Sequence, residues 1–147
     1  MKHLLWISVL GACSVSPESP ESNAMFSGAP TVRASRATQG DTFHGGAPQH
    51  KWVIVLGTTE GCAGDDVASV EINTLSGVTE IPLGPITVRT EENVVPSLPS
   101  AYFKFTGMAA TGGTVTIDAG GSFVVGSWAI TTAAGELTAT FGAPVCP

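Results

Sequence analysis

The fold class is decided by the stretch WVIVL at residues 52–56, a continuous apolar run between Lys51 and Gly57. Five residues are too few for a stable helix, and Val53, Ile54 and Val55 are β-branched, which favours an extended chain. An apolar run without alternation is typical of a strand that is buried on both faces. The run therefore predicts a central strand of a β domain.

The sequence after this run has the two-residue period of strands with one buried face. Residues 67–73 alternate, with Val70 and Ile72 predicted to point inward. The same spacing recurs in Ile86 and Val88, Phe103 and Phe105, Val115 and Ile117, and Leu137 and Phe141. No stretch sustains a helical period. We therefore predict an all-β fold, an antiparallel β-sandwich of about seven or eight short strands, with a small β-barrel as the alternative.

Glycine pairs suggest where the chain turns in its last third. Residues 111–114, TGGT, are predicted to form a hairpin turn, because adjacent glycines tolerate positive φ angles. Gly126-Ser127 separates two apolar stretches of opposite parity, which predicts a bulge or a crossing between sheets. With these turns, residues 101–141 are expected to form a meander of four strands.

Composition and charge limit the classes of partner. The chain of 147 residues fits one domain, and twelve acidic against six basic residues give a net charge of −6. Nucleic-acid binding draws most of its affinity from Lys and Arg that neutralise phosphates, so we expect no nucleic-acid partner. The same charge disfavours adsorption of the folded domain to anionic lipid.

The N-terminus has the layout of a secretory signal. A short basic start precedes the apolar residues 4–10, a run far below the roughly 20 residues of a membrane-spanning helix. The segment Leu10-Gly11-Ala12-Cys13 resembles the lipobox of bacterial lipoproteins. This resemblance implies a signal peptide at residues 1–12, cleavage before Cys13 and lipidation of its thiol. A conventional signal cut after Ala12, or a buried N-terminal helix, is the alternative.

The resemblance also implies a location, the bacterial cell envelope. Ser14 stands where an aspartate would resemble an inner-membrane retention signal, so the outer membrane is expected rather than the inner one. Residues 13–49 are rich in Ser, Pro, Gly and Ala, which predicts a lipidated cysteine followed by a flexible tether. The β-sandwich domain is then expected at residues 50–147. Residues 121–128, followed by residues 142–146, resemble the closing hairpin of uncharacterised β-rich bacterial lipoproteins, which have no activity to transfer.

Three cysteines leave one unpaired if the other two form a disulfide. Cys62 and Cys146 are predicted to pair in an oxidising compartment, and lipidation would then account for Cys13. The alternative is a thiolate metal site, but zinc needs more Cys or His ligands than lie nearby in the sequence.

Acidic and imidazole side chains are the weak candidates for metal binding. Glu60, Asp65 and Asp66 share one glycine-containing loop, and closely spaced carboxylates are ligands for Ca²⁺. A solvated acidic turn is the simpler interpretation, so we predict no cofactor, with calcium as the alternative. His44 and His50 are interpreted as exposed histidines in or beside the tether rather than as a metal site.

The sequence offers no catalytic motif. A serine hydrolase needs a base beside its nucleophile, and a glycosidase needs two carboxylates across a cleft. Glu71 and Glu80 are the pair that a sheet might bring together, but both are predicted to face solvent. Among the aromatic residues, Trp52 and Trp128 are assigned to the core and Tyr102 to the surface.

The resulting expectation is a membrane-anchored envelope lipoprotein whose β-sandwich is not an enzyme. The domain is expected to serve a binding or structural role, with an envelope protein or a glycan as partner. The alternative is an envelope enzyme or a calcium-dependent binding module that uses the Glu60–Asp66 loop.

Overall fold

The computed structural model describes residues 23–25, 34–90, 98–105 and 107–147. Their regular structure consists of strands, and no helix within these ranges is long and apolar enough to cross a membrane. The strands are β1 (Asn23–Met25), β2 (Ala34–His44), β3 (Ala47–Gly57), β4 (Ala68–Leu75), β5 (Gly84–Arg89), β6 (Ser100–Phe105), β7 (Ala110–Ala119), β8 (Phe123–Thr132) and β9 (Gly135–Pro144). The predicted signal peptide at residues 1–12 lies outside the described ranges.

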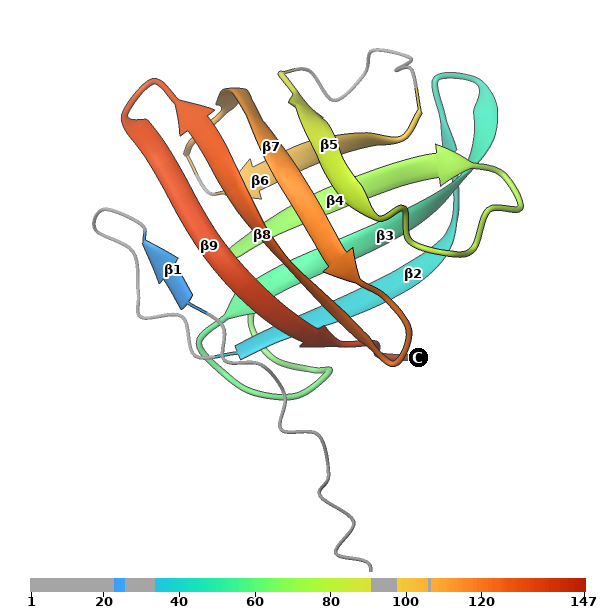
Figure 1. The fold of residues 1–147 in the computed structure, drawn as a ribbon, viewed down its shortest axis with the longest axis horizontal. Coiled ribbons are helices and arrows are strands. Elements are labelled where there is room, and N and C mark those ends of the chain that lie inside the picture. The colour runs from blue at the N-terminus through green and yellow to red at the C-terminus, as the bar shows by residue number, and fades with distance from the viewer. Residues whose placement is uncertain (1–22, 26–33, 91–97, 106) are drawn as a thin grey trace, which may run out of the picture.

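The strands form one folded sheet in the order β1-β9-β8-β7-β5-β6-β4-β3-β2. Figure 1 shows β5, β7, β8 and β9 in one layer, crossing in front of β2, β3, β4 and β6. The two layers meet at β5, which pairs antiparallel with β7 at residues 84–87 and parallel with β6 at residues 88–89. Every other strand pair is antiparallel. The sheet is not closed into a barrel, so the predicted all-β, sandwich-like fold is confirmed, with nine strands in the described residues.

The core fills the space between the layers. Its largest fully buried side chains come from both of them and include Phe103, Phe141, Ile54, Leu56 and Ile72. The Trp128 ring lies 5.9 Å from that of Phe103 and 5.8 Å from that of Phe141, in the tilted and edge-on geometries that aromatic pairs prefer. Trp52 and Trp128 are both buried, as predicted.

The two ends of the sheet approach each other at one corner. Ser35 Oγ donates a hydrogen bond to the Gly142 carbonyl at 2.9 Å, and the Cys146 amide donates to the Ala37 carbonyl at 2.7 Å. The C-terminal residues thus fasten β9 to the start of β2, and the rest of the β2 edge continues past them.

The predicted start of the domain at His50 is wrong, because the sheet includes residues that were assigned to the tether. β2 pairs with β3 along its whole length, from Ala34 opposite Gly57 to His44 opposite Ala47. Its small and polar side chains resemble those of a linker. An edge strand, however, gains much of its stability from backbone hydrogen bonds to its neighbour, and these do not depend on apolar composition. Two more parts of the predicted tether, residues 23–25 in β1 and 47–49 in β3, also belong to the sheet, and residues 13–22 and 26–33 lie outside the described ranges.

Both predicted glycine sites lie at register shifts between β7 and β8. Gly126 lies opposite a register shift in β7, where Ile117 pairs with Gly126 and Ala119 with Val125, whereas β8 pairs with β9 without a shift. A Cβ at Gly126 would lie 2.2 Å from the Thr116 carbonyl oxygen and 3.0 Å from the Phe141 ring, so the glycine allows close contact. Gly112 and Gly113 lie inside β7 at a register shift, not in a hairpin turn. The meander has three strands, β7, β8 and β9, because β6 pairs with β4 and β5 instead.

Candidate functional site

The loop between β3 and β4 is organised by the carboxylate of Asp65. Its Oδ1 accepts hydrogen bonds from the amides of Thr58 and Thr59, both at 2.9 Å, and from Thr59 Oγ1 at 2.7 Å. Its Oδ2 accepts one from Thr58 Oγ1 at 2.9 Å. The hydrogen bonds from Thr59 and then Thr58 lower the pKa of Asp65 from 3.8 to about 2, because they stabilise the charged form. Asp65 therefore acts as a turn-forming residue of its own loop.

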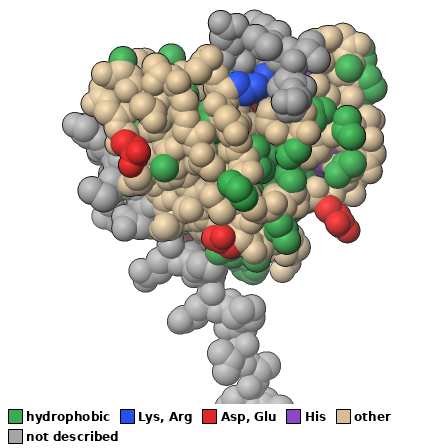
Figure 2. Space-filling model, turned by 45° about the horizontal axis from the view of Figure 1, so that its top comes forward, with side chains coloured by type: hydrophobic (Ala, Val, Ile, Leu, Met, Phe, Trp, Pro, Cys, Tyr) green, Lys and Arg blue, Asp and Glu red, His purple; other side chains and the backbone are tan. Residues whose placement is uncertain are grey.

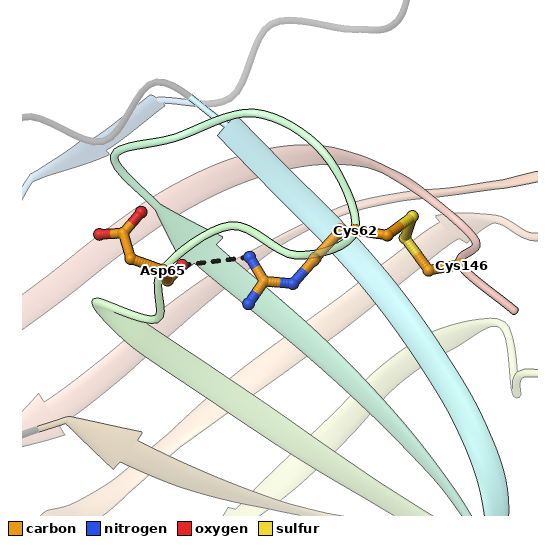
Figure 3. The surroundings of a disulfide bond; sticks show 4 residues. Cys62, Asp65 and Cys146 are labelled. Atoms are coloured by element: carbon orange, nitrogen blue, oxygen red, sulfur yellow. Dashed lines mark hydrogen bonds between the residues drawn. A yellow bond between two sulfur atoms is a disulfide. The ribbon is translucent and has the colours of Figure 1, made fainter.

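Arg36 holds this loop against the outer face of β2. The side chain is almost fully buried, and its guanidinium forms an ion pair with Asp66 and donates to the Asp65 carbonyl at 3.1 Å. Figure 3 shows this hydrogen bond. The loop also packs closely on the end of β3, since a Cβ at Gly57 would lie 2.2 Å from the Asp65 carbonyl oxygen.

A disulfide between Cys62 and Cys146 ties the loop to the C-terminus, as Figure 3 shows. The two Cα atoms are 5.7 Å apart, within the usual range for a disulfide. The predicted pairing is thus present in the structure. The disulfide joins the β3–β4 loop to Cys146, whose amide is hydrogen bonded to Ala37 of β2. The loop, the C-terminus and the start of β2 are therefore held together at this corner.

The three predicted calcium candidates occupy this loop, and two of them have protein partners. The Asp65 carboxylate accepts four hydrogen bonds, and the Asp66 carboxylate pairs with Arg36. Glu60 is exposed. Within the described ranges, no group of three or more His, Cys, Asp or Glu side chains is placed to hold a metal ion.

His50 is not the exposed histidine that was predicted. It lies in β3 and is buried, with Nδ1 2.9 Å from Asp41 Oδ1 and Nε2 3.2 Å from Gln39 Oε1. Both ring nitrogens thus face oxygen atoms from β2. His44 pairs in register with Ala47, and side chains alternate along a strand, so His44 and His50 lie on opposite faces of the hairpin.

A cleft of about 450 Å³ opens beside Gln39, between the inner face of β2 and β3, the β4–β5 loop and the β7–β8 turn. It is lined by Gln39, Trp52, Thr79, Glu80, Ile81, Leu83, Gly120 and Gly121. Leu83 is 66% exposed, and two other exposed apolar residues, Phe43 and Val78, belong to the same β2 and β4–β5 segments. On the side that carries the β4–β5 loop, Figure 2 shows exposed hydrophobic side chains near carboxylates. This cleft is the candidate binding site.

A second groove, of about 470 Å³, lies over β4 and β6 and is lined in part by Ser69, Tyr102 and Met108. Tyr102 points outward as predicted, and the cations of Arg89 and Lys104 each lie 5.7 Å from its ring centre. This groove is more open to solvent than the cleft.

Glu71 and Glu80 do not form a carboxylate pair. Glu71 lies on the outer face of β4, 2.7 Å from Lys104 Nζ and 3.8 Å from Lys51 Nζ. Glu80 lies in the β4–β5 loop and lines the cleft. The two carboxylates therefore belong to different surfaces, and Glu71 has two cationic partners.

Sequence reasoning missed Gln39 and Asp41, because both were assigned to the tether. The signal that identifies their strand is Gly45-Gly46, a glycine pair typical of a two-residue hairpin turn. In the structure both glycines have positive φ angles, 59° and 84°, and they join β2 directly to β3.

The fold and the site define a class of protein: a disulfide-linked, sandwich-like β domain with an apolar and acidic cleft beside an edge strand. Comparison with protein-family models, with curated proteins and with solved structures finds no match to this chain. Its function must therefore be argued from the residues themselves.

Proposed function

We propose that this protein is a lipid-anchored component of the bacterial cell envelope whose β domain binds another envelope component without catalysing a reaction. The lipid anchor is supported by the pairing of the cysteines. Cys62 and Cys146 pair with each other, so Cys13 is the one remaining cysteine of the three in the chain. It ends the segment that resembles a lipobox.

The disulfide also supports an extracytoplasmic location, because disulfides persist mainly in oxidising compartments such as the bacterial periplasm. The resemblance to lipoproteins favours the outer membrane, since Ser14 follows Cys13 where aspartate would resemble a retention signal. The lipid anchor supplies the membrane contact, and the acidic domain is free to engage a protein or glycan partner.

The cleft supports a binding role better than a catalytic one. Of the described histidines, His50 contacts a residue that lines the cleft, Gln39, and its two ring nitrogens face Asp41 and Gln39. Neither nitrogen is therefore directed at a nucleophile as a general base must be. The alternative, an enzyme or calcium module in the Glu60–Asp66 loop, has less support because Asp65 and Asp66 already have protein partners.

Metabolic labelling with a fatty-acid analogue tests the anchor. We expect the full-length protein to be labelled and to fractionate with outer membranes, whereas Cys13→Ser should lose both properties. Cys62→Ser is the matched control, since it also removes one thiol but leaves the lipobox intact. Equal labelling of the wild type and Cys13→Ser, or labelling of neither, would refute the anchor.

A further inference from the structure

We propose that the free edge of β2 beside the cleft pairs with an extended, basic segment of a partner protein, which adds a strand to the sheet. This inference rests on the proposed binding role and names the class of partner. It depends on three observations: the direction of the β2 backbone groups, the absence of a described strand beyond β2, and the charge beside the adjoining cleft.

The hairpin geometry fixes which backbone groups of β2 face the edge. In a two-residue hairpin the closing pair, His44 and Ala47, is hydrogen bonded, and bonded and non-bonded pairs then alternate along the ladder. Pro48 agrees with this alternation, because it lacks an N–H and falls at a non-bonded position opposite Phe43. The amides and carbonyls of residues 37, 39, 41 and 43 therefore point away from β3. At Ala37 the carbonyl is occupied by the Cys146 amide, which supports the assignment.

The next three residues of that set, Gln39, Asp41 and Phe43, present their backbone groups at the edge. No described strand pairs with them on that side, and in Figure 1 β2 lies at the margin of the folded sheet. Sheet edges are usually protected by Lys, Pro, a bulge or an inward-pointing charge, and Asp41 is such a charge here, so that a strand added at this edge has to bring a cation opposite it. Between Gln39 and Phe43 there is neither Lys nor Pro, and the pairing with β3 has no register shift. This edge is suited to accept another strand.

The chemistry of the partner follows from the side chains next to the edge. Gln39, Asp41 and Phe43 share the inner face with Trp52, which lines the cleft, so inward side chains of an added strand would lie over it. The Asp41 side chain is 87% exposed even though it contacts His50, and Glu80 adds a second carboxylate. Of the described residues, those that line the cleft include no Lys or Arg. A partner with apolar inward residues and a Lys or Arg opposite Asp41 complements this surface.

A second copy of the chain fits the edge less well. Antiparallel pairing of two β2 edges over their free residues, 39–43, would place the two Asp41 carboxylates opposite each other. Like charges directly opposite each other destabilise a strand pair, and each chain carries a net charge of −6. Charge therefore favours a basic partner over self-association.

The experiment uses the full-length protein in detergent and the blocked peptide Ser-Thr-Val-Thr-Lys-Thr-Val-Thr-Ser, whose lysine and valines share one face. At millimolar concentration we expect this peptide to slow amide hydrogen exchange at Gln39, Asp41 and Phe43 by about fivefold or more. The same peptide with Glu in place of Lys should protect these amides far less. Methylation of the backbone nitrogens of the lysine and both valines should abolish protection, because it removes half of the new hydrogen bonds and places methyl groups against the β2 backbone.

Charge reversal in the protein separates a specific contact from general destabilisation. Asp41→Lys should exchange the preference, so that the Glu peptide protects the edge better than the Lys peptide. Thr42→Lys is the control, since it introduces a lysine on the outer face while Asp41 is kept, and it should retain the original preference. Equal protection of the edge by the Lys and Glu peptides, or no protection by either, would overturn the proposal. A wild-type dimer with protected edge amides would also overturn it and assign the edge to a second copy.

These outcomes are independent of the anchor. If the peptide does not protect the edge but Cys13 is labelled normally, only the edge proposal is refuted. If the protein is not labelled but the peptides keep their charge preference, only the lipid anchor is refuted.

Discussion

Removal of the Cys62–Cys146 disulfide should cost the protein about 4.5 kcal/mol of unfolding free energy. The bond joins residues 84 positions apart. The chain-entropy relation for a closed loop of that size gives about 15 cal/mol/K, or about 4.5 kcal/mol at 25 °C. Small domains are stable by roughly 5–15 kcal/mol, so the bond would supply about a third or more of the total.

The structure indicates that this cost falls on the unfolded chain, with little change in the native state. Without the bond, the loop is still held by the hydrogen bonds between Asp65 and its threonines. The C-terminus is still held by the Val145 amide on the Ser122 carbonyl at 3.0 Å and the Cys146 amide on the Ala37 carbonyl. The native contacts therefore have other support, whereas the unfolded chain loses its one described cross-link.

The variant for this test is Cys62→Ser combined with Cys146→Ala. Cys62 is exposed and accepts a hydroxyl, whereas Cys146 is 4% exposed and needs an apolar replacement. Urea unfolding of the full-length protein, followed by tryptophan fluorescence, should give the predicted loss of stability. It should also give a larger m-value, because the unfolded chain exposes more surface. Cys13→Ser should change neither quantity. A loss below about 1 kcal/mol with an unchanged m-value would refute the chain-entropy reasoning.

Two further predictions concern single residues. The folded pKa of Asp65, about 2, lies below the ordinary 3.8, so the stability it contributes is complete above about pH 4 and is lost as the pH falls toward 2. Asp65→Asn should therefore reduce stability at neutral pH and flatten the fall in stability between pH 4 and 2, and an unchanged acid titration by circular dichroism would contradict this. Gly126→Ala should cost about 3 kcal/mol, because its Cβ would overlap the Thr116 carbonyl. Gly40→Ala, whose Cβ meets nothing within 4 Å, is the control and should change stability by no more than about 0.5 kcal/mol in thermal melts.

The successful predictions depended on features that are local in sequence. The alternation of Val70 with Ile72 and of Ile86 with Val88 correctly placed all four side chains in the core. Strand periodicity can be read within a few residues, because successive side chains point to opposite faces whatever the neighbouring strand is. The disulfide could be predicted because few pairings exist for three cysteines once Cys13 is assigned to another role.

The unsuccessful predictions concerned residues whose role is set by a distant neighbour. The sequence does not show that the irregularity beside Gly126 belongs to β7, nor that Thr116 and Phe141 lie close to this glycine. His50 follows a polar segment and is therefore predicted to be exposed; recognising the Gly45-Gly46 turn as a hairpin is what places Asp41 opposite it.

The sequence by itself determined the all-β class, the alternation of the core strands and the pairing of Cys62 with Cys146, because hydrophobic period and cysteine number are properties of the chain. Only the tertiary structure decided that β2 belongs to the sheet and that its edge borders the cleft. It also decided that Asp65 serves its own loop and that Glu71 and Glu80 lie on different surfaces. The physical reason is that a polar segment can be a linker or an edge strand with the same composition. The choice between the two is made by backbone hydrogen bonds to a neighbouring strand, which side-chain identity does not encode.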